Sequence, residues 1–200
     1  MQLTDQQHDA LIELINIAFS RAAAALSELT GQRVIVEVPR VAVHPIDRLA
    51  TALSEFVHGE IATVHQIFTG QVAGDALLLL GYESAMLLTD LLTEGRRQGG
   101  RLDSSDREVL TEVGNIVLNA CLGSFGNIVN VHISFSVPRM HIEALGDLLD
   151  SLVIGQEELR YALVVRADFR LRDSAVGGYL VIVLGVASLD RLVHAVESLG

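Results

Sequence analysis

Apolar side chains recur at every third or fourth position in two long segments of the chain, residues 5–29 and 106–124. This spacing predicts two amphipathic α-helices, each of which buries its apolar face against the rest of a domain. Polar side chains form a narrow stripe on the opposite face, because positions three and four apart lie on the same side of a helix. The stripes consist of Asp9, Glu13, Asn16 and Ser20 in the first helix and of Glu108, Glu112, Asn115 and Asn119 in the second.

The two stripes belong to a longer pattern that occurs twice, at a constant offset of 99 positions. Each copy has an acidic residue, three residues, Glu, two residues, Asn, 22 residues and then a proline, which is Pro39 or Pro138. One polar stripe alone would be typical of any amphipathic helix, but four coincident matches indicate an internal duplication. Asparagine is a poor residue for a helix interior, by about 0.5 kcal/mol relative to alanine, so its recurrence at one place suggests a function.

Shorter elements are predicted in the same order behind each long helix, and both long helices begin with the sequence of a capping box, Thr4 with Gln7 and Ser105 with Glu108. In the first half we expect strands at 33–38 (closed by Pro39), 41–44, 61–68 and 72–80, and helices at 46–54 and 84–93 (capped by Ser84). In the second half we expect a strand at 130–137 (ended by Pro138), a helix at 145–152, a hairpin of 159–171 and 175–184 with Gly177 and Gly178 near its turn, and a helix at 188–199 (capped by Ser188).

These elements predict a single domain, residues 1–200, with an α/β fold of the α+β type. Two tandem pseudo-symmetric repeats, residues 1–94 and 102–200, would be joined by a Gly- and Arg-rich linker at 95–101. The long motif helices would pack on a largely antiparallel sheet, with a pseudo two-fold relation between the repeats. We assign Pro39 and Pro138 a structural role, because proline at a strand end costs only a ladder donor.

The composition excludes several classes of function. Half of the residues are hydrophobic, as in a globular domain, and the net charge of −11 disfavours nucleic acids and anionic membrane surfaces as partners. The longest apolar runs, residues 76–80 and 179–184, are far shorter than the ~20 residues that cross a bilayer. No secretory signal pattern is present at the start, so we expect a cytoplasmic protein without a membrane partner. Cys121, on the apolar side of the second helix, is expected to be a core residue.

Common catalytic and metal-binding motifs are missing from the sequence. The seven histidines are scattered without the spacing of metal ligands, so we expect no metal site. There is no phosphate-binding Gly-rich loop, dinucleotide fingerprint or nucleophile elbow. The chemistry that remains is that of the paired Glu and Asn side chains on the two long helices.

A Glu and an Asn side by side form a weak catalytic pair unless another molecule brings the reactive group. An aspartyl phosphate on a partner protein is such a group, because its hydrolysis requires mainly a water molecule placed in line with the phosphorus–oxygen bond. The amide of Asn can hold that water. The Glu carboxylate can pair with a cation beside the phosphate and so fix the docking.

The complete pattern, present twice, resembles that of the CheC-type phosphatases of bacterial chemotaxis, the family of CheC, CheX and FliY. The resemblance covers nearly the whole chain and implies a phosphatase for the aspartyl phosphate of a CheY-like receiver. It implies that Asn16 and Asn115 orient the attacking water, that Glu13 and Glu112 engage a receiver lysine, and that Asp9 fills the first motif position. It also implies no cofactor of the protein itself, since the Mg²⁺ belongs to the receiver.

The sequence departs from the family pattern at three places. Glu108 stands where the family has Asp or Ser, and it could instead complete the capping box that Ser105 begins. Gly114 matches the glycine that often precedes the motif Asn, whereas Ile15 does not and would either tighten the first helix or crowd a docking surface. The glycine that commonly follows the motif Asn is absent after Asn16. We still expect both sites to be competent.

Three other functions are compatible with the sequence. The protein could be a non-catalytic module that binds a phosphorylated receiver or a CheD-like deamidase. It could be a flagellar-switch component of the FliY type, for which we expect an added rotor-binding domain that this sequence does not show. It could also be a structural scaffold in which the paired stripes have no role.

Overall fold

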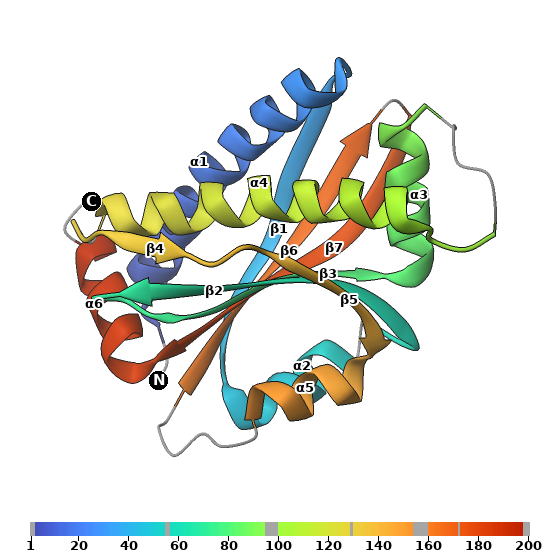
Figure 1. Ribbon diagram of the computed structural model, residues 1–200. Helices are drawn as coiled ribbons and strands as arrows, with labels where there is room; N and C mark the ends of the chain where they lie inside the picture. Colours follow the sequence, from blue (N-terminus) through green and yellow to red (C-terminus); the bar gives the residue numbers. More distant parts are fainter. Residues whose placement is uncertain are drawn as a thin grey trace.

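A curved antiparallel sheet carries the two long helices on one face and two short helices on the other (Figure 1). The computed structural model describes residues 3–54, 57–94, 100–128, 130–153, 160–171 and 173–197. The elements are α1 (Asp5–Thr30), β1 (Val34–Pro45), the 3₁₀ helix η1 (Ile46–Arg48), α2 (Leu49–Ser54), β2 (Glu60–Gly70), β3 (Gly74–Gly81), α3 (Tyr82–Leu92), α4 (Ser104–Ile128), β4 (Ile133–Phe135), β5 (Arg139–Ala144), α5 (Leu145–Val153), β6 (Arg160–Leu171), β7 (Ser174–Gly185) and α6 (Val186–Glu197).

The strand order is β1-β6-β7-β3-β2-β4, and β5 also pairs with β2. Every strand pair is antiparallel, so the expected mixed fold with helices on an antiparallel sheet is confirmed. Exchanging β1 with β4–β5, β2 with β6 and β3 with β7 returns the same order reversed. This order is compatible with the predicted pseudo two-fold relation, which stays a prediction together with the repeat bounds. Residues 95–99 of the expected linker lie outside the described part of the chain.

Two hydrophobic cores lie on the two faces of the sheet. The larger core contains the apolar faces of α1, α3, α4 and α6, and the smaller contains those of α2 and α5. The central strand β3 reads as an unbroken apolar run because both of its faces are covered. Leu78 and Leu80 point into the larger core, whereas Leu77 and Leu79 point into the smaller one.

The first long helix begins as predicted, and the second does not. Thr4 and Gln7 form the expected capping box, and Gly31 ends α1 with a left-handed φ of 67°. At α4 the Ser105–Glu108 box is wrong, because Asp103 and Asp106 form the cap. The Oδ1 of Asp103 accepts from the Asp106 amide at 2.9 Å, and the Oδ2 of Asp106 accepts from the Asp103 amide at 3.0 Å. Glu108 is therefore exposed and not used in capping.

Several smaller predictions are corrected by the strands. The break expected at Pro39 is wrong, because β1 runs on to Pro45 with only a shift of register between Glu37 and Arg40. An edge strand tolerates proline, since one side of it needs no ladder donor; the Pro39 side chain itself lies outside the description. The strand expected at 130–137 shortens to β4, and Pro138 lies between β4 and β5, an unpredicted strand.

Corrections of the same kind apply to the later elements. Ser84 and Ser188 are not caps, because α3 and α6 each begin two residues earlier. Gly177 and Gly178 lie in β7, paired with Asp168 and Ala167, and not at the turn. A Cβ on Gly178 would lie 2.6 Å from a methyl group of Leu80, so close packing accounts for this glycine.

The two long helices would also satisfy a simple test for membrane spans. Their most apolar stretches have mean hydropathies of 1.4 for α1 and 1.2 for α4. In this fold both helices bury side chains such as Phe19 and Val117 completely against the sheet, as core helices do. The absence of a membrane partner, expected from the short apolar runs, stays a prediction.

Candidate functional site

The first polar stripe lies fully exposed on α1. Asp9, Glu13, Asn16 and Ser20 face outward, whereas Ile15 behind them is completely buried. The hydroxyl of Ser20 donates to the backbone oxygen of Asn16 at 2.8 Å, so the Asn16 amide is not engaged by it. A shallow hollow of about 610 Å³ follows this stripe, lined by Asp9, Ile12, Glu13, Asn16, Ile17, Ser20, Arg21 and Ala24.

The second stripe, on α4, is more constrained. Glu108 and Glu112 are exposed, whereas Asn115 and Asn119 are half-buried. The Nδ2 of Asn119 donates to the Oδ1 of Asn115 at 2.7 Å, which fixes the orientation of the motif amide. The two motif asparagines therefore sit in different environments, although their sequence patterns match.

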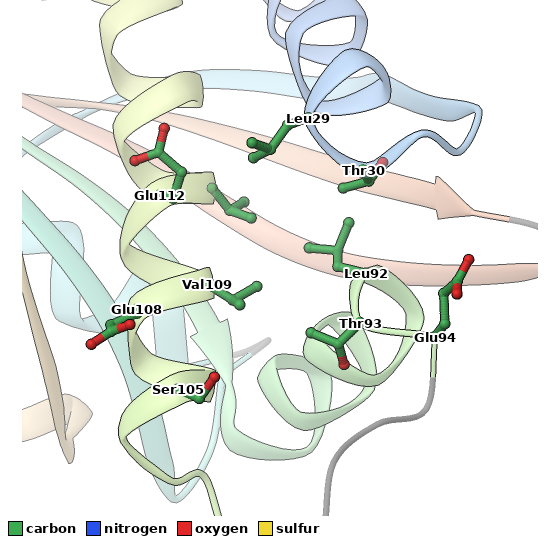
Figure 2. A pocket seen from close by; sticks show the side chains of 10 residues that line it. Leu29, Thr30, Leu92, Thr93, Glu94, Ser105, Glu108, Val109 and Glu112 are labelled. Carbon is green, nitrogen blue, oxygen red and sulfur yellow. The ribbon is translucent and has the colours of Figure 1, made fainter.

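A hollow of about 640 Å³ lies beside the second stripe, between α4 and the last turns of α1 and α3. Figure 2 shows Val109 turned toward Leu92 of α3, while the carboxylates of Glu108 and Glu112 lie on the side of α4 away from α3. Asn115 does not line this hollow. Glu108 and Glu112 nevertheless form part of its lining, together with polar side chains such as Thr30 and Ser105, so the hollow is a mixed polar and apolar recess at the acidic end of the second motif.

The positions before the two motif asparagines explain one departure from the family pattern. A Cβ on Gly114 would overlap the Cγ1 of Val64, so only glycine lets α4 pack this closely on β2. Ile15, at the matching position of α1, is completely buried and fills the core. Ile15 therefore does not crowd the outer surface. Ile17, which follows Asn16, is 46% exposed and reaches that surface, as Ile12 and Ala24 also do.

Replacing Gly114 by alanine is expected to lower the free energy of unfolding by about 1–3 kcal/mol, because the added methyl group overpacks the contact with Val64. Gly123 on the same helix has no atom within 4 Å of an added Cβ and is the matched control. Gly123→Ala should raise stability by about 0.5–1 kcal/mol through helix propensity alone. Urea unfolding of both variants measures the difference, and equal effects would contradict the close contact.

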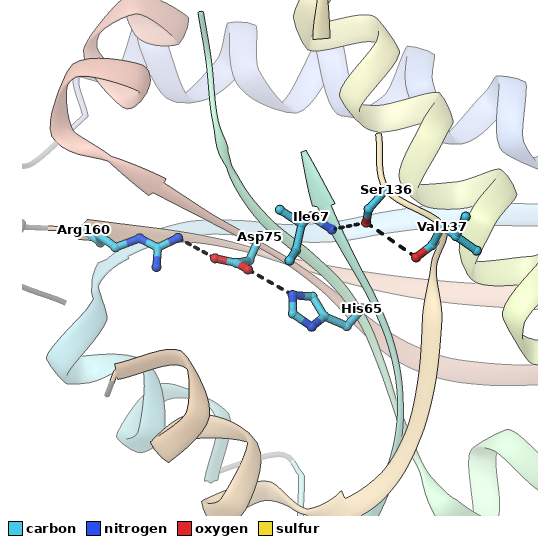
Figure 3. A network of polar contacts seen from close by, with 6 residues as sticks. All are labelled: His65, Ile67, Asp75, Ser136, Val137 and Arg160. Carbon is cyan, nitrogen blue, oxygen red and sulfur yellow. Dashed lines mark hydrogen bonds and ion pairs between the residues drawn. The ribbon is translucent and has the colours of Figure 1, made fainter. Parts of the chain in front are cut away.

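A charged cluster on the opposite face of the sheet was not predicted from the sequence. Asp75 receives hydrogen bonds from the Nη2 of Arg160 at 2.6 Å and the Nε2 of His65 at 3.0 Å (Figure 3). Burial raises the pKa of the Asp75 carboxyl, but the hydrogen bonds and charges of His65 and Arg160 outweigh burial and leave that pKa below its usual value. The position of Asp75 in the otherwise apolar strand β3 is the one sequence feature that could have indicated this cluster.

The cluster lies away from both polar stripes and is a structural feature of the second core. Nearby, Ser136 connects the segment before Pro138 to β2, because its Oγ accepts a hydrogen bond from the backbone N–H of Ile67 at 2.9 Å. Cys121 is buried as expected, and burial raises the pKa of its thiol. Among the residues that the structure describes, no group of three His, Cys, Asp or Glu side chains could hold a metal ion.

No protein-family model matches the chain. Among curated proteins, the chain is similar to the flagellar motor switch phosphatase FliY of Bacillus subtilis, with 26% identity over 142 residues, which are 70% of this chain and 36% of FliY. It is also similar to CheC1 of Halobacterium salinarum, named a CheY-P phosphatase, with 26% identity over 165 residues, which cover 82% of this chain and 83% of CheC1. Both similarities agree with the resemblance to CheC-type proteins.

Solved structures share the fold of this chain. FliY of Thermotoga maritima superposes with a TM-score of 0.78 at 20% identity, over 99% of both chains. The FliM middle domain of H. pylori superposes with a TM-score of 0.66 at 11% identity, over 96% of this chain and 99% of that one. The chain spans about a third of the length of the B. subtilis FliY, and its own activity is therefore a matter of proposal.

Proposed function

We propose that this CheC-type protein is a cytoplasmic phosphatase that hydrolyses the aspartyl phosphate of a CheY-like receiver. The observation that carries the proposal is the position of a Glu and an Asn on the outer face of each of two long helices that pack on the core. Glu13, Asn16 and Glu112 are exposed, and Asn115 is half-buried. Neither stripe lies inside a closed cavity that would hold a small substrate. Such surfaces suit a partner protein that brings its own reactive group. The names of the two curated relatives support the same activity.

In this mechanism Asn16 or Asn115 holds a water molecule through its amide, in line with the bond between phosphorus and the receiver's aspartyl oxygen. The water oxygen forms a bond to phosphorus while the bond to the aspartyl oxygen breaks, which releases phosphate and the free aspartate. Glu13 or Glu112 pairs with a lysine of the receiver and sets the position of the asparagine. The receiver's Mg²⁺ supplies neutralisation of the phosphoryl charge. Asp9 and Glu108 extend the acidic edge of each site.

The first test is the decay of a phosphorylated CheY-like receiver with Mg²⁺, with and without the protein. Decay that speeds up in proportion to the concentration of the protein would support the phosphatase. Unchanged decay together with binding would instead indicate a module that sequesters the receiver. If the protein neither binds a phosphorylated receiver of the source organism nor accelerates its decay, whichever receiver is used, the proposal is contradicted.

The hydrogen bond between Asn119 and Asn115 predicts a difference between the sites. In an Asn16→Ala background, where only the second site works, Asn119→Ala is expected to lower turnover about three- to tenfold, because the loss of one hydrogen bond frees the motif amide. The matched control is Ser20→Ala in an Asn115→Ala background, expected to change turnover by less than about twofold since Ser20 bonds to backbone only. Steady-state assays measure both changes, and an equal loss of turnover for Asn119→Ala and Ser20→Ala would contradict the proposal that Asn119 orients Asn115.

A further inference from the structure

Arg21 distinguishes the first site from the second. Among the described residues lining the hollow on α1, Arg21 is the cation, and Asp9 and Glu13 are the acids. The matching position of the second helix, 99 residues later, is Ala120. The two motifs are alike in their Glu and Asn residues but differ in charge at this position, in the hollow that Asn16 also lines.

The guanidinium of Arg21 retains most of its hydrogen-bonding capacity. Its Nη1 donates to the Oγ of Ser124 on α4 at 3.5 Å, a long contact, and the Ser124 hydroxyl itself donates to the backbone oxygen of Ala120 at 2.8 Å. Within the described part of the chain, no carboxylate lies within ion-pair distance of Arg21. A guanidinium has five N–H donors, so at least four stay available to a ligand.

The negative charge of the expected partner surface would attract the guanidinium of Arg21. A phosphorylated receiver presents an anionic phosphoryl group, which the carboxylate of Asp9 would repel, whereas Glu13 is proposed to pair with the receiver's lysine. The overall charge of −11 adds to that repulsion. A cation within the first hollow offsets it locally, and a guanidinium matches the geometry of phosphoryl oxygens.

We propose that Arg21 binds the anionic edge of the receiver's phosphoryl site and makes the first site the tighter of the two for phosphorylated receiver. This inference rests on the proposed phosphatase activity. The contact forms on docking and persists through the reaction, so it affects KM and leaves kcat nearly unchanged. Because the ion pair is close to the surface, its contribution falls as the salt concentration rises.

The test compares each site alone in steady-state assays with phosphorylated receiver and Mg²⁺. In the Asn115→Ala background, Arg21→Ala is expected to raise KM about fivefold with kcat within about twofold, and Arg21→Lys to keep KM within about twofold. In the Asn16→Ala background, Ala120→Arg is expected to lower KM about threefold. Arg48→Ala is the control for net charge, because Arg48 is exposed in η1 on the other side of the sheet and should leave KM unchanged.

The outcomes separate the two proposals. If the unaltered protein fails to accelerate decay, the phosphatase proposal itself fails. If it accelerates decay but Arg21→Ala leaves KM unchanged, or changes kcat alone, the role of Arg21 is overturned while the phosphatase stands. Loss of all turnover in the Asn115→Ala protein would also overturn it, since the first site would then be inactive. Unchanged thermal unfolding of Arg21→Ala excludes a folding defect as the cause of a raised KM.

Discussion

Replacing both motif asparagines by alanine is expected to return a phosphorylated receiver to the rate at which it decays alone. In the proposed mechanism Asn16 and Asn115 place the attacking water, and misplacing a reacting group costs about 100-fold in rate. Glu13 and Glu112 remain exposed on their helices in the double variant, so binding of the receiver should persist. Loss of turnover with retained binding would assign the asparagines to the chemical step.

A matched control for this double variant is present on α4. Asn127 is exposed on the same helix but lies outside the motif, so Asn127→Ala should leave receiver decay as fast as with the unaltered protein. The single variants then rank the two sites. Retention of half or more of the acceleration by the double variant would show that the water is held elsewhere and would refute the assigned roles.

Removal of Arg160 is expected to give the largest loss of stability, about 2–3 kcal/mol in the free energy of unfolding. The Arg160 side chain is only 9% exposed and Asp75 only 19%, so the variant Arg160→Ala leaves a carboxylate in the second core with His65 as its remaining partner. The matched control is Arg170→Ala. Arg170 pairs with Glu37 at 3.0 Å, but both side chains are about half exposed, and such pairs contribute less than ~1 kcal/mol.

The same cluster predicts a dependence of stability on pH. The Asp75 pKa is lower in the folded protein than in the unfolded chain, so its contribution is present above the unfolded pKa of about 3.9 and is lost as the pH falls through the folded pKa. Urea unfolding at pH 5 and at progressively lower pH should show a steeper loss for the unaltered protein than for Asp75→Asn. Parallel curves would show that Asp75 is not the titrating group.

The parts of the fold that follow from local periodicity were predictable, and the parts set by register were not. The stripes of α1 and α4 follow from a helical period, which does not depend on the rest of the chain. The start of α4 was misplaced because residues 103–106 offer four side chains that can cap a helix. The strand β5 was missed although the offset of 99 maps it onto residues 40–45 of β1.

Within the site, the sequence predicted the exposure of the first stripe and of Glu112, but neither the half-burial of Asn115 and Asn119 nor the hydrogen bond between them. The exposure of Glu13, Asn16 and Glu112 is confirmed, whereas their catalytic roles stay predictions. The bond from Asn119 to Asn115 depends on rotamers that no spacing encodes. The burial of Ile15 and the contact of Gly114 with Val64 depend on how each helix approaches the sheet. The cluster around Asp75 requires β3 to lie beside both β2 and β7, which is a matter of topology.

The strand order has a consequence for the number of proposed docking surfaces on one chain. The edge strand β1 pairs with β6, and β4 and β5 pair with β2, so each half completes the sheet of the other. A fragment that contained only α1 would keep β1 but lose β6, the partner of β1 in the sheet, and a fragment that contained only α4 would lack β2 and β3, on which α4 packs. Deletion therefore cannot reduce the protein from two surfaces to one, whereas substitution of a single asparagine can. Because the two halves share one sheet, a point mutation can change the number of working docking surfaces while the fold stays intact.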